Sequence, residues 1–244
     1  MFRRGPTGLP ADPPLAAHGV QVSSFNNSFY FILNLIVKQS KELASHFLNL
    51  PPALQPQVLI SSPYYRCIQT TAPIADALGL PIILDEGISE WHGRVSNGGE
   101  NPVAADVDTL ASMFPQIDAN QSRNYTVLVP NSGETMKELF ARISLALEKI
   151  ISRYSESTSI LICLHAAVNI MCGRALTGDH ELKVHTGTAS IGEYVRISDS
   201  MSLGNWKCIR NGDCSHLEEG EERDWEFGGD EPGADGNIQR ATKL

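Results

Sequence analysis

The chain has few cysteines, few aromatic residues and no long uninterrupted apolar run. Its five cysteines, at positions 67, 163, 172, 208 and 214, show neither metal-ligand nor paired-disulfide spacing. We therefore expect free thiols in a reducing compartment, with no metal, no other cofactor and no secretion. The most apolar stretch, residues 29–37, is interrupted by Asn34 and is shorter than the ~20 residues of a membrane span. It also lies too far into the chain and lacks the cleavage site of a signal peptide, so we expect no membrane association.

Positive charge is scarce as well. The 244 residues carry 28 acids against 19 Lys and Arg, for a net charge of −9. Residues 211–235 hold ten acids against one base, Arg223, so this segment alone accounts for the net charge. A neutral body with an acidic segment argues against direct binding to the nucleic-acid backbone.

A buried-strand pattern runs from Val58 to Ile60 and is followed by a Ser-Ser-Pro turn and a helix with Arg66 in its first turn. Helix N-termini have unpaired N–H groups and a positive dipole, which favour anions. A guanidinium there adds a forked, permanently charged partner for phosphate oxygens. An ordinary turn with a solvated arginine is the alternative interpretation.

A second apolar run, residues 159–164, ends at His165 and is followed by a helical pattern over 168–176. Such runs are typical of parallel strands covered on both faces, where ligands bind at the carboxyl ends. The loop between the two regions carries Glu86 and Glu90 beside Trp91 and His92. The pattern predicts an α/β fold of three layers, with a mostly parallel central sheet flanked by helices, and an anion site with one proton-transferring carboxylate.

These segments together resemble the histidine-phosphatase (phosphoglycerate-mutase-like) superfamily. The resemblance implies that Arg66 binds phosphate, that Glu90 is the general acid or base, and that His165 is a second phosphate-pocket residue with a catalytic role. Glu86 is a rival for Glu90, but Glu90-Trp91-His92-Gly93 fits the family pattern better. The resemblance covers residues 6–197, which we expect to form one domain.

The family places its nucleophilic histidine in an Arg-His-Gly motif after the first strand. Here no apolar run precedes Arg4, and arginine stands before Gly5. The next family landmark, residues 12–20, is present, and its His18 fits the entry to the following helix rather than the nucleophile. We therefore expect the chain to lack the first strand and the nucleophile, and hence to fold poorly alone.

Residues 22–38 interrupt the helical stripe that would otherwise join Val20 to Ala44 and Leu48. The polar start of this segment, residues 23–28, predicts that the helix is broken there. We therefore expect a helix only over residues 39–48. We interpret the segment as an anomalous insertion, a retained intron of a truncated gene model.

Further helices are expected over 66–78, 104–113 and 136–154, the last capped by Ser132, and further strands over 81–84 and 192–197. Residues 198–244 are expected to form an acidic tail, with a hairpin turn at Asn211-Gly212. An acidic, glycine-rich tail is commonly solvated and disordered, but Trp206, Trp225 and Phe227 interleave with the acids and favour a partner contact. The segment resembles that of fungal subunits of TFIIIC, the RNA polymerase III initiation factor.

Two classes of function follow. One is a non-catalytic TFIIIC-associated subunit that is nuclear, contacts TFIIIC subunits through the C-terminal segment, and retains a site for a phosphorylated small molecule or peptide. The other is an active phosphomonoesterase of unknown substrate. It would work through a phosphohistidine supplied by an upstream segment, and it would be cytoplasmic unless bound to TFIIIC. We favour the first, because the expected nucleophile is missing.

Overall fold

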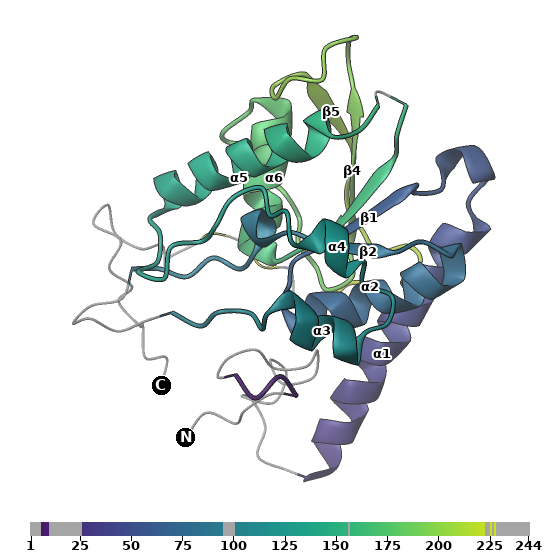
Figure 1. The fold of residues 1–244 in the computed structure, drawn as a ribbon. Coiled ribbons are helices and arrows are strands. Elements are labelled where there is room, and N and C mark those ends of the chain that lie inside the picture. Colours follow the sequence, from purple (N-terminus) through teal and green to yellow (C-terminus); the bar gives the residue numbers. More distant parts are fainter. Residues whose placement is uncertain are drawn as a thin grey trace, which may run out of the picture.

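The computed structural model describes residues 6–9, 26–94, 101–155, 157–222, 225 and 227, and for residues 26–37 the backbone alone. Five strands, six α-helices and two short 3-10 helices lie within these residues (Figure 1). The strands are β1 (Val58–Ser61), β2 (Ile82–Leu84), β3 (Ile160–Cys163), β4 (Ile191–Arg196) and β5 (Trp206–Asp213). The helices are α1 (Asn26–Asn49), α2 (Tyr65–Leu78), α3 (Val107–Met113), α4 (Ala119–Ser122), α5 (Met136–Ser152) and α6 (Ala166–Thr177), with η3 (Pro52–Leu54) and η4 (Glu86–Ile88).

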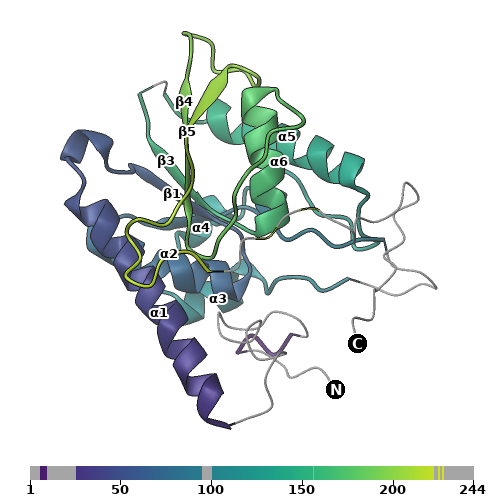
Figure 2. The same cartoon turned by 180° about the vertical axis from the view of Figure 1, so that it is seen from behind.

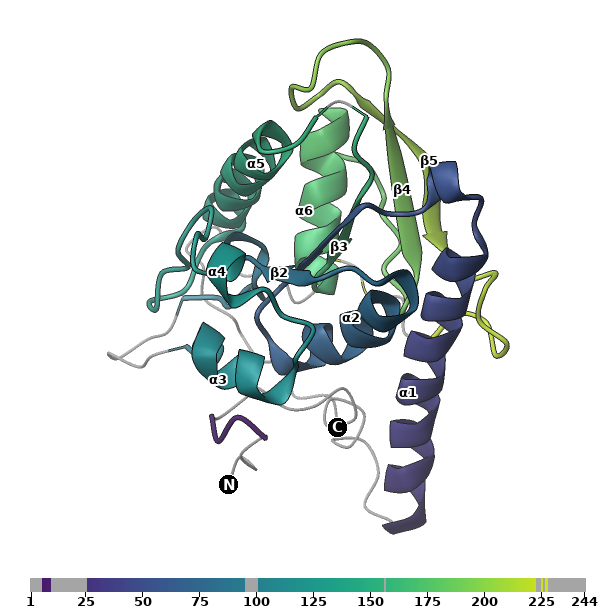
Figure 3. The same cartoon turned by 45° about the vertical axis from the view of Figure 1, so that its right-hand side comes forward.

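The central sheet has the order β2-β1-β3, with both outer strands parallel to β1. Successive residues of β1 face opposite sides: Leu59 packs in the apolar cluster of α1 and α2, and Ile60 packs in that of α5 and α6. Figure 3 shows these helix pairs on the two sides of the sheet. The predicted α/β fold with a helix-covered parallel sheet is confirmed. The prediction rested on the strand-length runs that are apolar on both faces.

β4 and β5 form a separate antiparallel pair beside α6 (Figure 2). The predicted hairpin turn at Asn211-Gly212 is wrong, because both residues lie inside β5. The Asn211 side chain instead accepts from His185 N at 2.9 Å and donates to Lys183 O at 2.8 Å. Part of the segment expected as a tail therefore forms a strand.

α1 begins well before the predicted start at residue 39. It is continuous from Asn26 to Asn49, so the break predicted within residues 23–28 does not extend beyond Asn26. The described part of the segment interpreted as an insertion, residues 26–38, thus continues the helix that follows it. Residues 10–25, with the landmark that includes His18, lie outside the described residues, as does Arg4.

The N-terminus of α5 is capped by Thr135 and not, as predicted, by Ser132. Thr135 accepts from Glu138 N, and the Glu138 carboxylate accepts from Thr135 N, which completes a capping box. Both Ser132 and Thr135 precede the helix, and spacing alone does not show which of them is the cap. Thr135 is the cap because it forms reciprocal hydrogen bonds with Glu138.

A buried ion pair between Glu134 and Arg142 holds the loop that follows β2. The side chains are 4% and 3% exposed, and Arg142 Nε and Nη2 both donate to the Glu134 carboxylate. Arg142 Nη1 also donates to the carbonyl oxygens of Gly87 and Ser89, at 2.9 and 3.1 Å. Five donated hydrogen bonds from one guanidinium fix the backbone leading to Glu90.

The same loop is also fixed from its other end. Asp85 accepts from Gly87 N at 2.8 Å and from Thr126 Oγ1 at 2.7 Å. A Cβ on Gly87 would come within 2.2 Å of Thr126 Oγ1, so only glycine fits this approach. The loop therefore presents Glu90 in a defined position.

Among the described strands, β3 pairs with β1 alone, and all four of its residues are half-buried. Unpaired backbone groups at a partly buried edge cost roughly 1–3 kcal/mol each, against a total stability of about 5–15 kcal/mol. We therefore predict a low, broad thermal transition with aggregation for the isolated chain, measured by circular dichroism. A monomer with a sharp, reversible transition would contradict the prediction.

Replacing Glu134 by alanine would leave the Arg142 charge buried and unpaired. We predict a free energy of unfolding lower by about 3–5 kcal/mol, measured by pulse proteolysis in urea on gel-filtered monomer. Glu148→Ala, which removes an exposed carboxylate from α5, the helix that carries Arg142, is the control and should change little. Equal midpoints for the two variants would show that the ion pair does not hold the loop.

Candidate functional site

Arg66 lies in the first turn of α2, directly after β1 and the Ser62-Pro63 turn. Its side chain is 12% exposed, so the guanidinium is largely withdrawn from solvent. Nη2 donates to Glu90 Oε2 at 2.8 Å and lies 3.0 Å from His165 Nδ1. Nη1 is buried and has no hydrogen-bond partner among the described residues. A buried N–H donor of a cation without an acceptor is costly, and it marks a place where an anion would fit.

Glu90 stands on the other side of this guanidinium. Its Oε2 lies 3.1 Å from His165 Nδ1, and Oε1 accepts from Trp91 N at 3.0 Å. Burial alone would raise the pKa of Glu90, but His165 and Arg66 outweigh it and hold that pKa below its ordinary value. Glu90 is therefore a carboxylate at neutral pH. Glu86, the rival candidate, accepts from Val129 N at 3.1 Å and is not hydrogen-bonded to Arg66.

His165 caps the N-terminus of α6 at the carboxyl end of β3. Its Nε2 lies 2.8 Å from Ser62 Oγ and 3.6 Å from Cys67 Sγ. Burial lowers the pKa of His165, although Glu90 opposes this. In the neutral ring, a proton on Nδ1 is donated to Glu90 Oε2, and Nε2 then accepts from the Ser62 hydroxyl. The structure thus brings the three predicted site residues, Arg66, Glu90 and His165, into one cluster.

Two residues without a role in the sequence analysis complete the site. The Tyr64 ring lies under the Arg66 guanidinium, 4.8 Å from Cζ, and its hydroxyl donates to Pro102 O at 2.9 Å. That hydroxyl also lies 2.9 Å from His92 Nε2, and burial lowers the pKa of His92. His92 was visible beside Glu90 in the sequence, whereas nothing in the spacing distinguished Tyr64 from Tyr65.

The charges at the site balance. Arg66 is the cation and Glu90 the anion, while His165 and His92 are held neutral by burial. Arg142, the next guanidinium inward, is fully used by Glu134 and the loop carbonyls. Within the described residues, the site therefore has one cationic group to offer an anion.

A cavity of about 440 Å³ adjoins the cluster and meets it at Tyr64, Glu90 and His92. Its other walls come from the loop after β2 and from residues 101–108 and 123–131. A second hollow of about 610 Å³ lies against α1 and His216 and contains none of the predicted site residues.

The described residues contain no group of three or more His, Cys, Asp or Glu side chains arranged to hold a metal ion. None of the described helices is both long and apolar enough to cross a membrane.

Comparison with known proteins agrees with this geometry. Residues 37–208 match the model of the histidine phosphatase superfamily, branch 1. The chain is 30% identical to the transcription factor tau 55 kDa subunit of Saccharomyces cerevisiae, in an alignment that covers 96% of this chain and 56% of that protein. The chain thus spans about half the length of this relative.

Two solved structures share the fold. A mycobacterial glucosyl-3-phosphoglycerate phosphatase in complex with VO3 is 17% identical, with a TM-score of 0.50 over 72% of this chain and 85% of that chain. The same mycobacterial enzyme with inorganic phosphate is 16% identical, with a TM-score of 0.50 over 77% and 88%. The family model covers most of this chain, and the chain therefore belongs to branch 1 of the histidine phosphatase superfamily.

Proposed function

We propose that this chain binds the phosphate group of a phosphorylated small molecule or peptide at Arg66 and His165 without hydrolysing it, and that it serves as a subunit associated with TFIIIC. The observation that carries the binding proposal is the buried, unpartnered Nη1 of Arg66. Arg66 lies in the first turn of α2, and both a guanidinium and a helix N-terminus favour an anion.

His165 supports the same ligand. Burial keeps the ring neutral, and a dianion beside it would favour the imidazolium and draw a proton onto it. Such a proton adds the second positive charge that the resting site lacks. Phosphate binding at this site is thus coupled to protonation of His165.

The lack of turnover is supported by two features. A phosphohistidine route needs a free imidazole as nucleophile, and among the described residues the imidazoles at the site are His92 and His165, both hydrogen-bonded within its walls. The leaving oxygen also needs a proton, and Glu90 is held ionised by Arg66 and His165. Binding is therefore the favoured role for this chain.

An active phosphomonoesterase remains the second candidate, favoured by the Arg66–Glu90–His165 cluster itself. In that case a segment outside this chain would supply the nucleophilic histidine, and ligand binding would separate Glu90 from Arg66. The two candidates differ in whether phosphate is released, and they share the binding site.

Association with TFIIIC is supported by the yeast relative, which is a subunit of transcription factor tau. The aromatic residues of the C-terminal segment support it as well. Trp225 is 40% exposed, and its backbone is held by hydrogen bonds with Thr186 Oγ1. A large aromatic side chain held at the surface is a common anchor for a partner protein. We propose a nuclear location on the same ground.

We predict that gel-filtered monomer binds inorganic phosphate in calorimetric titration and shows no turnover of p-nitrophenyl phosphate. Arg66→Ala should weaken phosphate binding by about tenfold or more, because it removes charge-assisted hydrogen bonds. Arg94→Ala, which removes an exposed guanidinium, is the matched control. Turnover that is lost in Arg66→Ala would instead establish the phosphomonoesterase.

We predict that the chain co-purifies with co-expressed subunits of TFIIIC and that Trp225→Ala reduces the recovered complex several-fold. Leu128→Ala removes a more exposed apolar side chain away from the C-terminal segment, and should leave the complex intact. Equal recovery of both variants would show that the partner binds elsewhere.

A further inference from the structure

We propose that the 440 Å³ cavity beside Glu90 binds the non-phosphate part of the ligand, and that it selects phosphomonoesters carrying an amine over those carrying a second acidic group. This inference rests on the proposed phosphate site at Arg66. A cavity of this volume is in the range of small-molecule sites. The cavity shares Tyr64, Glu90 and His92 with the site, and Glu90 is in direct contact with Arg66, so the cavity lies next to the proposed phosphate position.

The charge of the cavity is strongly one-sided. Its lining includes four carboxylates, those of Glu86, Glu90, Asp106 and Asp108, and one cationic side chain, Arg123. Arg123 is engaged by Asp108, and Glu90 by Arg66. Glu86 and Asp106 are then left without a hydrogen-bonded or ion-paired cation among the described residues. A positive group would be attracted here, and a second phosphate or carboxylate repelled.

Glu86 is the most informative of these side chains. Its Oε1 accepts a backbone N–H from Val129 at 3.1 Å. Burial raises its pKa, since the nearby Arg142 compensates only in part. An ammonium group in the cavity would favour the ionised form of Glu86 and form a partly buried ion pair with it.

Ser89 gives an independent sign of a ligand. It lines the cavity, is only 4% exposed, and within the part of the chain that the structure describes its Oγ has no hydrogen-bond partner. A buried hydroxyl without a partner is destabilising, and an N–H or O–H of a bound molecule would satisfy it. The cavity therefore combines negative charge with an unmet polar group, which suits a hydrogen-bonding cation better than an apolar group.

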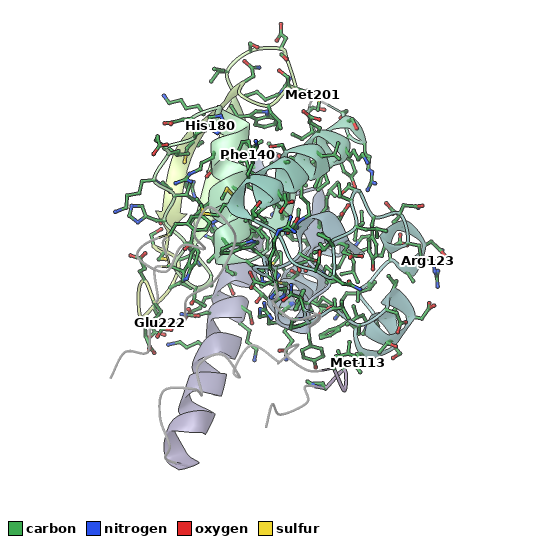
Figure 4. All side chains as sticks on the ribbon, turned by 90° about the vertical axis from the view of Figure 1, so that its left-hand side faces the viewer. Met113, Arg123, Phe140, His180, Met201 and Glu222 are labelled. Atoms are coloured by element: carbon green, nitrogen blue, oxygen red, sulfur yellow. The ribbon has the colours of Figure 1, made fainter. Side chains whose placement is uncertain are left out.

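The cavity and Glu222, a described residue of the acidic segment, lie on different parts of the surface. Figure 4 shows Arg123, at the cavity, and Glu222, in the acidic segment, on opposite sides of the molecule in that view. Occupation of the cavity therefore does not require removal of this part of the acidic segment.

The test compares three small phosphomonoesters by calorimetric titration of gel-filtered monomer at low ionic strength. Phosphoethanolamine carries an amine, glycerol 3-phosphate is neutral beyond its phosphate, and 3-phosphoglycerate carries a carboxylate. We expect phosphoethanolamine to bind tightest and 3-phosphoglycerate weakest, with about a tenfold difference between them. Glu86→Gln keeps the acceptor for Val129 and should reduce this difference several-fold. The exposed variant Glu148→Gln should leave the difference unchanged.

The outcomes separate the two proposals. If inorganic phosphate binds but the three esters bind equally, or 3-phosphoglycerate binds tightest, the cavity does not select an amine and this inference is overturned. The same holds if Glu86→Gln leaves the difference intact. If neither phosphate nor any ester binds, the proposed phosphate site is wrong, and the cavity proposal falls with it.

Discussion

The buried pair of Glu134 and Arg142 is the interaction on which the site depends. It joins the loop after β2 to the start of α5 through the backbone as well as the side chains, because Glu134 N donates to His92 O at 2.9 Å and Trp91 Nε1 donates to Glu134 O at 3.0 Å. Burying two charges gains little net stability, since desolvation offsets most of their attraction. The contribution of the ion pair is geometric. Glu90 lies between Ser89, whose carbonyl accepts from Arg142, and Trp91, whose indole N–H donates to the Glu134 carbonyl.

The resulting site is electrically neutral at rest, and this differs from what an efficient phosphate-binding site needs. One guanidinium is partly neutralised by one carboxylate, and the two nearby imidazoles are kept uncharged by burial. Binding a dianion then requires a change in the protonation of His165 or in the Arg66–Glu90 contact. Either change carries an energetic cost, which makes weak, proton-coupled binding the expected behaviour.

The sequence was sufficient for the three strands of the central sheet and for the three central side chains of the site. The apolar runs around Leu59 and Ile162 identified parallel strands, and the ends of such strands meet at one edge of the sheet. Arg66 and His165 follow those ends directly, so local position determined their proximity. Tyr64 was not identified. Its role depends on contacts with His92 and Arg66, and the sequence alone does not show which of the two adjacent tyrosines makes them.

The other errors concern a turn, a helix cap and the start of a helix. Asn211-Gly212 has the composition of a tight turn, yet in the structure Asn211 binds the backbone of residues 183 and 185, and the chain stays extended. Thr135 caps α5 because Glu138 returns its hydrogen bond. The early start of α1 likewise runs against the local preference of residues 26–28, which are polar turn formers. The expected boundary after residue 197, the missing nucleophile and the retained intron stay predictions.

The last described residue, Phe227, has a consequence for how the two ends of this protein communicate. Its ring packs edge-to-face against Trp91, with the centroids 6.0 Å apart, and Trp91 follows Glu90 directly in the chain. A partner that draws Phe227 away therefore changes the packing of the residue next to the carboxylate that holds Arg66. If that change altered the affinity of the proposed phosphate site, thermodynamic reciprocity would require a ligand at Arg66 to alter the affinity for the partner by the same factor. The contact between Trp91 and Phe227 is thus the physical connection between the C-terminal segment and the proposed site.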